Sequence, residues 1–240
     1  MTSIIDGKKI AKEIEIELTD KVSSMERVPK LSVVQIGDDP ASASYIKAKA
    51  NAASRIGINL THHHLSKNTS VKELENLVNN LNKSEDGLII QLPIPKKLEP
   101  VLEMIEPEND VDGFHSENLG KLVQGISGMV PCTPAGIIEL LYRSGNDPSG
   151  KHVVIVGRST IVGTPLSLLL SQKGIDATVT LCHSRTKFLE EHCKKADILV
   201  AAVGKANMIT KEMVKQGVVI IDVGVNRTSE GLVGDVSSDV

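Results

Sequence analysis

Aromatic residues are scarce in this sequence, and the scarcity gives weight to each one that is present. The chain of 240 residues contains no Trp, two Phe and two Tyr, so its core must be built from aliphatic side chains. An aromatic residue among polar neighbours therefore calls for a specific explanation. Tyr45 stands in such a segment, among serine, alanine and lysine residues.

Long apolar runs, an excess of one charge and paired cysteines are also lacking. No stretch approaches the ~20 consecutive apolar residues of a membrane-spanning helix, and the N-terminus has no apolar core of signal-peptide length. The formal net charge of −3, with both signs interspersed, argues against a nucleic-acid or membrane-surface binder. The three cysteines form no CxxC pair and fit neither a disulfide framework nor a zinc site. We therefore expect a cytoplasmic protein with reduced thiols and no bound metal.

Strand-like apolar runs alternate with helical periodicity along the chain, which predicts an α/β fold with parallel sheets. We expect two domains, an N-terminal α/β domain at residues 1–115 and a second, Rossmann-like domain at 116–240. In the first domain, Ser70 and Glu73 form the capping box that marks a helix start. The elements expected there are strands at 31–37, 58–65 and 87–92 and helices at 41–56 and 70–82.

The second domain has the clearer sheet. Its four apolar runs are nearly continuous, which predicts strands buried on both faces, as in doubly wound sheets. A helix is expected before them, with Thr133 as its N-cap and Pro134 at its first helical position. The strands are expected at 153–156, 177–181, 198–203 and 218–221.

A glycine loop follows the first of these strands. Gly157-Arg158-Ser159-Thr160-Ile161-Val162-Gly163 lies between a buried strand and a helix, where free backbone N–H groups and the helix dipole can hold a phosphate. The spacing is not G-x-G-x-x-G, because only Gly157 and Gly163 remain, and the loop alone is compatible with a plain turn. Its position after a buried strand favours a nucleotide site.

The choice of nucleotide depends on the residues after the next strand. NAD sites usually carry an Asp or Glu there for the ribose 2′-hydroxyl, whereas this chain has His183-Ser184-Arg185-Thr186. Arg158 and Arg185 supply cations, and Ser184 supplies a hydroxyl donor, all suited to a 2′-phosphate. We predict NADP over NAD, although Arg185 on a solvated surface is the simpler alternative.

A second group of polar residues lies in the first domain. Tyr45 and Lys49 are spaced to share one helix face, Gln91 ends a predicted parallel strand, and Asp112 lies in a loop of turn-forming residues. Each has an ordinary structural explanation, but their joint appearance favours a functional site. Tyr-x-x-x-Lys also occurs in short-chain dehydrogenases, where it follows the nucleotide fold; here it precedes the glycine loop, which argues against that family.

Six stretches in order along the chain resemble the bifunctional methylenetetrahydrofolate dehydrogenase/methenyltetrahydrofolate cyclohydrolase family. Together they cover most of the chain and are highly specific. The resemblance implies oxidation of 5,10-methylenetetrahydrofolate with NADP, followed by hydrolysis of the methenyl product to 10-formyltetrahydrofolate in one-carbon metabolism. The stretches are PASASYIKAK at 40–49, QLPIP at 91–95, DVDGFH at 110–115, PCTPAG at 131–136, GRSTIVG at 157–163 and DVGVN at 222–226.

The resemblance also implies a role for each candidate residue. Tyr45 stacks on the folate, Lys49 is the central catalytic group, and Gln91 holds and tunes that lysine. Asp112 binds the pterin edge. The implied partners are a small-molecule folate and a second copy of the chain in a homodimer, with a cleft between the two domains. The implied cofactor contacts are Gly157, Arg158, Ser159, Ser184, Arg185 and Val225.

Two other functions are compatible with part of this pattern. A shikimate-type NADP oxidoreductase has the same architecture but would not be expected to carry the four polar residues together. A non-enzymatic NADP-binding protein would not require Lys49.

Two further features of the sequence bear on the site. His62-His63-His64 suggests a metal, but consecutive residues of a strand point to alternate faces. The family's Gly/Pro-rich loop and final helix after Gly234-Asp235-Val236 are absent from this sequence, and that loop is expected to border the folate cleft.

Overall fold

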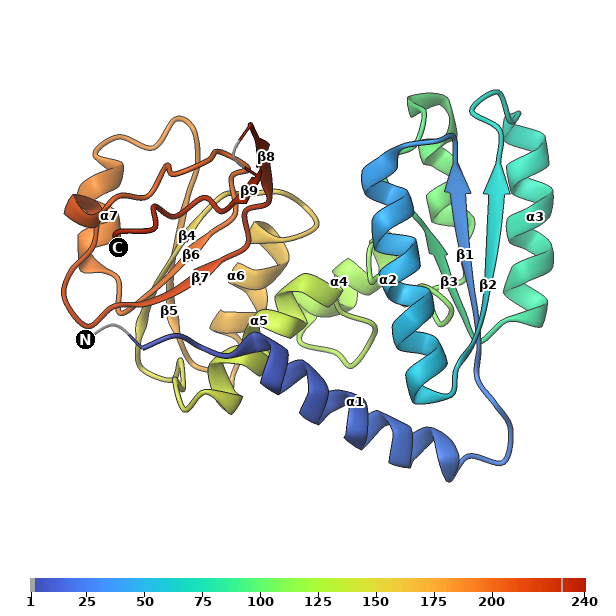
Figure 1. The fold of residues 1–240 in the computed structure, drawn as a ribbon, viewed down its shortest axis with the longest axis horizontal. Helices are drawn as coiled ribbons and strands as arrows, with labels where there is room; N and C mark the ends of the chain where they lie inside the picture. Colours follow the sequence, from blue (N-terminus) through green and yellow to red (C-terminus); the bar gives the residue numbers. More distant parts are fainter. Residues whose placement is uncertain (1–2, 230) are drawn as a thin grey trace. The chain divides into compact units, whose positions relative to one another are not determined.

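The computed structural model describes residues 3–229 and 231–240. The chain divides into two compact units. Unit 1 comprises the chain up to Lys121 together with Ser127–Val130, and unit 2 comprises Leu122–Ile126 and Pro131–Val240. Each unit contains a parallel sheet with helices on both faces, so the predicted α/β class is confirmed (Figure 1).

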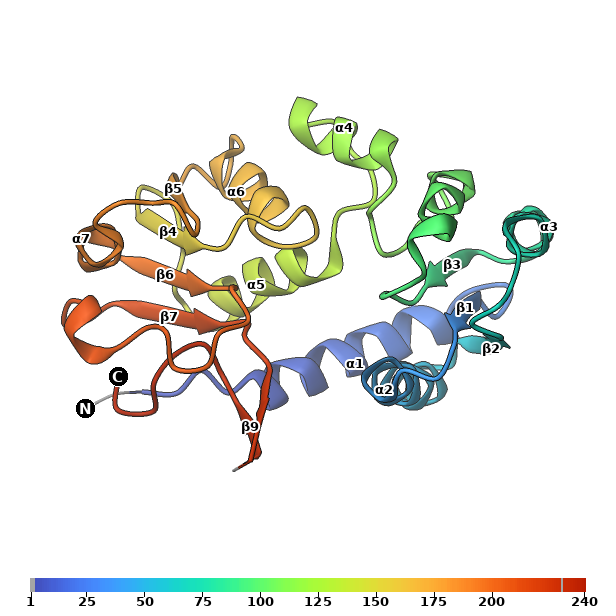
Figure 2. The ribbon, with the colours of Figure 1, turned by 90° about the horizontal axis from the view of Figure 1, so that it is seen from above.

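Unit 1 is built on a three-stranded parallel sheet in the order β2-β1-β3. On one face, α3 and η1 pack against a core that includes Val34, Leu88 and Leu98. On the other face, α2 contributes Ile46 to a smaller cluster with Val33 (Figure 2). The elements are α1 (Gly7–Ser23), β1 (Lys30–Ile36), α2 (Pro40–Ile56), β2 (Asn59–Leu65), α3 (Val71–Ser84), β3 (Gly87–Ile90), the 3₁₀ helix η1 (Lys96–Met104) and the first six residues of α4 (Ser116–Gln124), whose last three residues belong to unit 2.

Local signals account for the ends of two of these helices. Asp39 caps α2 by accepting the N–H of Ser42, and Gly57 ends the helix in the left-handed conformation at φ +86°. The capping box of Ser70 and Glu73 at the start of α3 is confirmed. These short-range contacts involve only neighbouring residues, which is why the sequence predicts them well.

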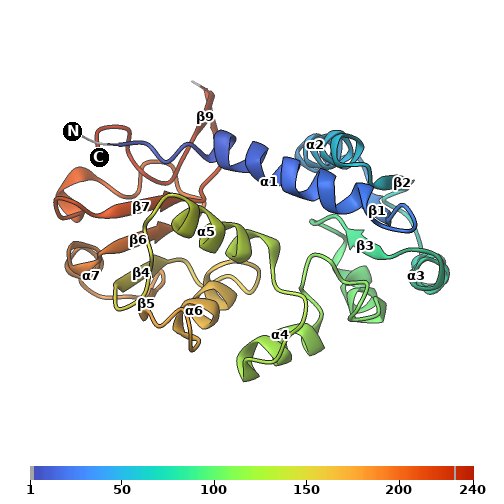
Figure 3. The same ribbon diagram turned by 90° about the horizontal axis from the view of Figure 1, so that it is seen from below.

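Unit 2 is built on a four-stranded parallel sheet in the order β5-β4-β6-β7. The helix α7 lies beside the sheet, and α6 contacts the strands β4 and β5 (Figure 3). Cys193 of α7 and Ala196, which follows the helix, are buried against strand residues. The elements are α5 (Cys132–Arg143), β4 (His152–Val156), α6 (Gly163–Ser171), β5 (Thr178–Cys182), α7 (Leu189–Lys195), β6 (Ile198–Ala201), η2 (Lys211–Met213), β7 (Val219–Asp222), β8 (Asn226–Thr228) and β9 (Gly231–Val233).

Two predictions for unit 2 are wrong in detail. Burial on both faces holds for the central strands β4 and β6 but not for β5 and β7, which are the edges of the sheet and are partly exposed. Thr133 is not an N-cap, because α5 begins at Cys132 with Pro131 in the capping position. Pro134 is tolerated in the first turn, where backbone N–H groups have no partner within the helix.

Four parts of the fold were not predicted: α1, η1, α4 and the β8–β9 hairpin. Ile10 is the buried residue of α1, which otherwise exposes most of its length and so has a weak apolar pattern. In β2, the rings of His62 and His64 stack with centroids 5.9 Å apart, while His63 contacts Ser32 on the other face. This alternation is the one predicted for consecutive strand residues.

Candidate functional site

Three of the four candidate residues of unit 1 meet at the carboxyl edge of its sheet. Lys49 Nζ donates a hydrogen bond of 3.2 Å to Gln91 Oε1 and lies 3.9 Å from Asp112 Oδ1. The Lys49 and Asp112 side chains are 32% and 20% exposed, so the ion pair is shielded but still open to a ligand. A side chain held in a defined position at the edge of a sheet is what general acid–base catalysis requires.

The backbone explains why these residues meet. The N–H of Gln91 donates to Val34 O, which continues the parallel pairing of β3 with β1 beyond the end of the strand. Gln91 Nε2 donates to Leu92 O at 3.1 Å, and this bond turns Oε1 toward Lys49. The N–H of Leu88 donates to Asn109 O, so the segment that leads to Asp112 runs beside β3.

Tyr45 lies one helical turn before Lys49 on α2. The residue is 53% exposed, so it is accessible from the solvent. The neighbouring Ile46 is 4% exposed and belongs to the core on the sheet side of the helix. The helix therefore turns its aliphatic side chain inward and leaves the tyrosine ring accessible to a flat ligand.

Asp112 is the electrostatically perturbed member of the group. Burial raises the pKa of its carboxyl above the ordinary value of 3.8, Lys49 opposes this shift, and the nearby Asp110 adds to it. Asp112 also lines a small cavity of about 110 Å³ whose wall includes Ile90, Phe114 and His115. A partly buried carboxylate with a perturbed pKa at a cavity wall is a typical feature of a ligand site.

In unit 2, the glycine loop brings two backbone segments into close contact. Gly157 has φ +125°, and a Cβ there would lie 2.1 Å from Ala202 O. A Cβ on Gly163 would lie 1.9 Å from Gly157 O. The two glycines are therefore required by the close approach of backbone segments between β4 and the N-terminus of α6.

The remaining cofactor candidates follow the ends of neighbouring strands. Gly157 N donates to Cys182 O, which places the glycine loop beside the loop that carries Ser184 and Arg185. Arg158 is exposed, and Ser159 Oγ accepts the N–H of Val162 and shapes the turn. Val225, 61% exposed, follows β7, whose pairing with β6 brings it to the same edge.

These features fit a 2′-phosphorylated dinucleotide. The glycine loop joins the buried strand β4 to the helix α6, which is where dinucleotide-binding sheets hold the pyrophosphate. The loop after β5 offers a serine, an arginine and no carboxylate, which suits a phosphate better than a ribose hydroxyl. Thr186 Oγ1 accepts the N–H of His183 and so holds this loop in shape.

Two carboxylates that sequence reasoning missed fasten the loops after β6 and β7. Asp235, with no exposed surface, accepts hydrogen bonds from Val203 N, Gly204 N and Lys205 N at 2.7, 2.9 and 2.8 Å. Burial works to raise the pKa of Asp235, but these bonds and one from Asn226 outweigh it and the pKa is lowered. Asp222 accepts from the N–H groups of three residues that include Asp235 itself. The glycines beside these acids are a sequence signal for their close packing. A Cβ on Gly224 would overlap the Asp235 carboxylate, and a Cβ on Gly234 would overlap the Asp222 carboxylate.

Within the described ranges, no group of three or more His, Cys, Asp or Glu side chains is arranged to hold a metal ion. The same part of the chain contains no helix long and apolar enough to cross a membrane.

The fold and site define a class: a two-unit α/β enzyme with a dinucleotide-binding sheet in one unit and a Lys–Gln–Asp group in the other. Comparison with known proteins identifies the family. The catalytic domain of tetrahydrofolate dehydrogenase/cyclohydrolase matches residues 5–112, and the NAD(P)-binding domain matches residues 131–240. The chain therefore belongs to the tetrahydrofolate dehydrogenase/cyclohydrolase family, and the predicted resemblance is confirmed.

Individual relatives agree with this assignment. The bifunctional protein FolD of Brevibacillus brevis is 49% identical over 245 residues, which cover 99% of this chain and 86% of the relative. The bifunctional methylenetetrahydrofolate dehydrogenase/cyclohydrolase of Campylobacter jejuni is 40% identical with a TM-score of 0.94, covering 99% of this chain and 86% of that one. The Trypanosoma brucei enzyme, solved with NADP and an inhibitor, is 35% identical with a TM-score of 0.92 and the same coverage.

Proposed function

We propose that the Lys49–Gln91–Asp112 group carries the chemistry of both reactions of this family. The reactions are the oxidation of 5,10-methylenetetrahydrofolate to the methenyl form with NADP and the hydrolysis of that product to 10-formyltetrahydrofolate. The observation that supports this assignment is the position of the Lys49 amine, 3.2 Å from Gln91 Oε1 and 3.9 Å from Asp112 Oδ1.

Each residue has a distinct role in this proposal. Asp112 accepts hydrogen bonds from the donor edge of the pterin, and Tyr45 stacks on the flat ring system. Gln91 holds the Lys49 amine in place. Lys49 relays a proton to or from the water that attacks the methenyl carbon, because hydrolysis needs proton transfer. Hydride transfer needs no proton at this site and depends mainly on the position of the reacting carbon.

NADP is the proposed hydride acceptor, bound by unit 2. When bound, it supplies a nicotinamide ring that takes up the hydride. The backbone at Gly157 and Ser159 holds the pyrophosphate, and Arg158, Ser184 and Arg185 hold the 2′-phosphate. Val225, exposed at the end of β7, contributes an apolar contact.

Replacement of Lys49 tests the proposed mechanism. Lys49→Met keeps the aliphatic stem and removes the amine, so cyclohydrolase activity should fall by at least ~10²-fold, the usual scale for a general acid–base group. Dehydrogenase activity should fall less, and methenyl product should accumulate. The assay mixes enzyme, methylenetetrahydrofolate and NADP and follows the NADPH and methenyl absorbances together.

Lys47→Met is the matched control, because Lys47 is an exposed lysine of the same helix. It should leave both activities unchanged. If both activities fell equally in a folded Lys49→Met variant, Lys49 would only position the substrate and the proton relay would be wrong. If neither fell, Lys49 would have no role in the chemistry.

We further propose that residues 1–115 form the folate domain and 116–240 the NADP domain of a cytoplasmic homodimer. The two family matches, at 5–112 and 131–240, support this division. Light scattering during size-exclusion chromatography should give twice the chain mass of 25.7 kDa. A peak at the single-chain mass at micromolar concentration would contradict the dimer.

A further inference from the structure

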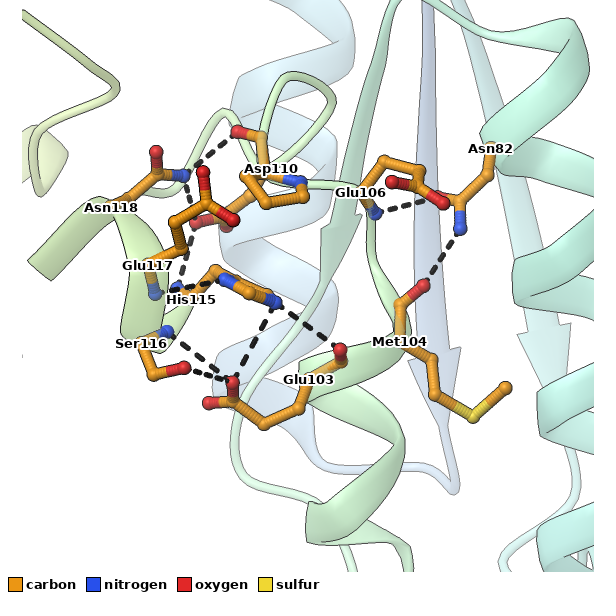
Figure 4. Close-up of polar contacts among 10 residues, drawn as sticks. Asn82, Glu103, Met104, Glu106, Asp110, His115, Ser116, Glu117 and Asn118 are labelled. Atoms are coloured by element: carbon orange, nitrogen blue, oxygen red, sulfur yellow. Dashed lines mark hydrogen bonds and ion pairs between the residues drawn. The ribbon is translucent and has the colours of Figure 1, made fainter. Parts of the chain in front are cut away.

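The loop that carries Asp112 is anchored by an extensive set of hydrogen bonds within unit 1 (Figure 4). At its start, Asn82 of α3 donates to Met104 O at 2.7 Å and accepts the N–H of Glu106 at 3.1 Å. Asn109 Nδ2 donates to the carbonyl groups of Asn82 and Glu85. The segment between η1 and Asp110 is therefore fixed to α3 before the loop begins.

Asp110 fixes the other end of the loop. Its side chain is buried, with the residue 4% exposed, and Oδ2 accepts the N–H of His115 at 2.8 Å and Asn118 Nδ2 at 3.0 Å. Asn118, 1% exposed, also donates to Pro107 O at 2.8 Å. One buried carboxylate oxygen thus connects the first residue of the loop to the last residue of the loop and to the start of α4.

His115 extends this connection to η1. Its Nδ1 accepts the N–H of Glu117 at 3.0 Å, so the neutral ring carries its proton on Nε2, which faces Glu103 O at 3.2 Å. Ser116 Oγ donates to Glu103 Oε2 at 2.5 Å. The start of α4 is therefore held against η1 as well as against Asp110.

We propose that Asp110 is a positioning residue for folate binding: by closing the Asp110–His115 loop through Oδ2, it places the Asp112 carboxylate where the pterin edge binds. This inference rests on the proposed role of Asp112. Burying a carboxylate costs free energy that neutral donors offset only in part, which is unexpected for a residue that merely fills space. The Asp110 side chain accepts bonds from within the loop and from α4, whereas Asp112, two residues on, faces Lys49.

A double-mutant cycle separates positioning from general stability. Tetrahydrofolate and NADP affinities are measured by titration calorimetry for Asp110→Ala in two backgrounds, wild type and Asp112→Asn. We expect about a tenfold loss of tetrahydrofolate affinity in the wild-type background and less than about twofold in the Asp112→Asn background, because coupled residues are not additive. NADP affinity should not change. Asp110→Asn keeps one oxygen that accepts both N–H groups and should retain most of the affinity.

The outcomes distinguish the inference from the function on which it rests. Equal losses of tetrahydrofolate affinity in both backgrounds, or no loss in either, overturn the positioning role while Asp112 remains a folate residue. If Asp112→Asn by itself leaves tetrahydrofolate affinity unchanged, the proposed function of Asp112 fails and the inference falls with it. Should Asp110→Ala not fold, Asn118→Ala removes one of the two donors to Asp110, and the same cycle applies with the same expected coupling.

Discussion

Replacing Asp112 by Asn should weaken folate binding and yet stabilise the fold. The substitution keeps the shape of the side chain but places an amide donor where the pterin edge requires an acceptor. A buried polar group left unmatched costs about 1–3 kcal/mol, which corresponds to a loss of roughly 5- to 150-fold in folate affinity. NADP affinity should hardly change, because the proposed NADP site lies in unit 2.

The effect on stability follows from two opposing contributions to the Asp112 carboxylate. Attraction to Lys49 at 3.9 Å favours the charged form and amounts to about 4 kcal/mol at an effective dielectric constant of 20. Burial and the neighbouring Asp110 disfavour the charged form and prevail, since the pKa of Asp112 is raised above 3.8. The ionised carboxylate is thus less favourable in the folded protein than in the unfolded chain.

The stability of the folded protein depends on pH through the Asp112 carboxyl. With a raised folded pKa, the folded state binds the Asp112 proton more tightly, so ionisation lowers stability as pH rises from 3.8 through the folded pKa. Asp112→Asn does not ionise and escapes this loss. The difference in Tm between Asp112→Asn and wild type should therefore grow in favour of the variant between about pH 4 and pH 7.

Thermal melting across this pH range, paired with calorimetry of tetrahydrofolate binding at pH 7, checks both halves of the prediction. A stabilised variant with weakened folate binding is the pattern of a residue kept for function at a cost in stability. A Tm difference that does not change with pH, or that favours the wild type at pH 7, would refute the electrostatic reasoning. Normal folate affinity would remove Asp112 from the site.

Three further predictions concern unit 2. Gly157→Ala should lower NADP affinity at least about tenfold, because its Cβ would lie 2.1 Å from Ala202 O. Gly150→Ala, the control at another positive φ with no atom within 4 Å of its Cβ, should leave NADP affinity unchanged. Titration calorimetry of both variants with NADP tests this difference. The wild type should bind NADP more tightly than NAD by at least ~1.4 kcal/mol, and Arg158→Ala should reduce this difference. Equal affinities of the wild type for the two cofactors would contradict the 2′-phosphate assignment. Asp235→Asn should lower stability at pH 7 by about 1–3 kcal/mol in urea unfolding, because an amide cannot accept all of its hydrogen bonds. Since the pKa of Asp235 is lowered, its stabilisation is present above the unfolded pKa of 3.8 and is lost as pH falls through the folded value, so the deficit should shrink on acidification; a deficit that is constant with pH would contradict this.

Short-range chemistry was the part of this protein that its sequence predicted best. The capping box at Ser70, the helix end at Gly57 and the apolar strands depend on residues close together in the chain. The errors arose where distant parts of the chain decide the outcome. The strands β5 and β7 are partly exposed because they lie at the edges of the sheet. The order of the strands in a sheet cannot be deduced from the residues of any one strand.

The candidate residues divide in the same way. Residue type and local position made Lys49, Gln91 and Asp112 candidates, and the family matches agree with the motifs that contain them. Only the tertiary structure put the Lys49 amine within 3.2 Å of Gln91 Oε1 and 3.9 Å of Asp112 Oδ1, because α2, β3 and the following loop are separated in sequence and meet through sheet pairing.

The residues that hold the sites in shape were decided by the tertiary structure alone. Asp110 in the sequence is one turn-forming residue among several, and Asp235 is one acid near the end of the chain. Both carboxylates matter because they are buried and accept backbone N–H groups. Asp235 accepts N–H groups from residues about 30 positions earlier in the chain, and Asp110 accepts the N–H of His115 at the other end of its own loop. A sequence shows which groups can donate and accept, but the partner that each buried group finds depends on how the chain packs.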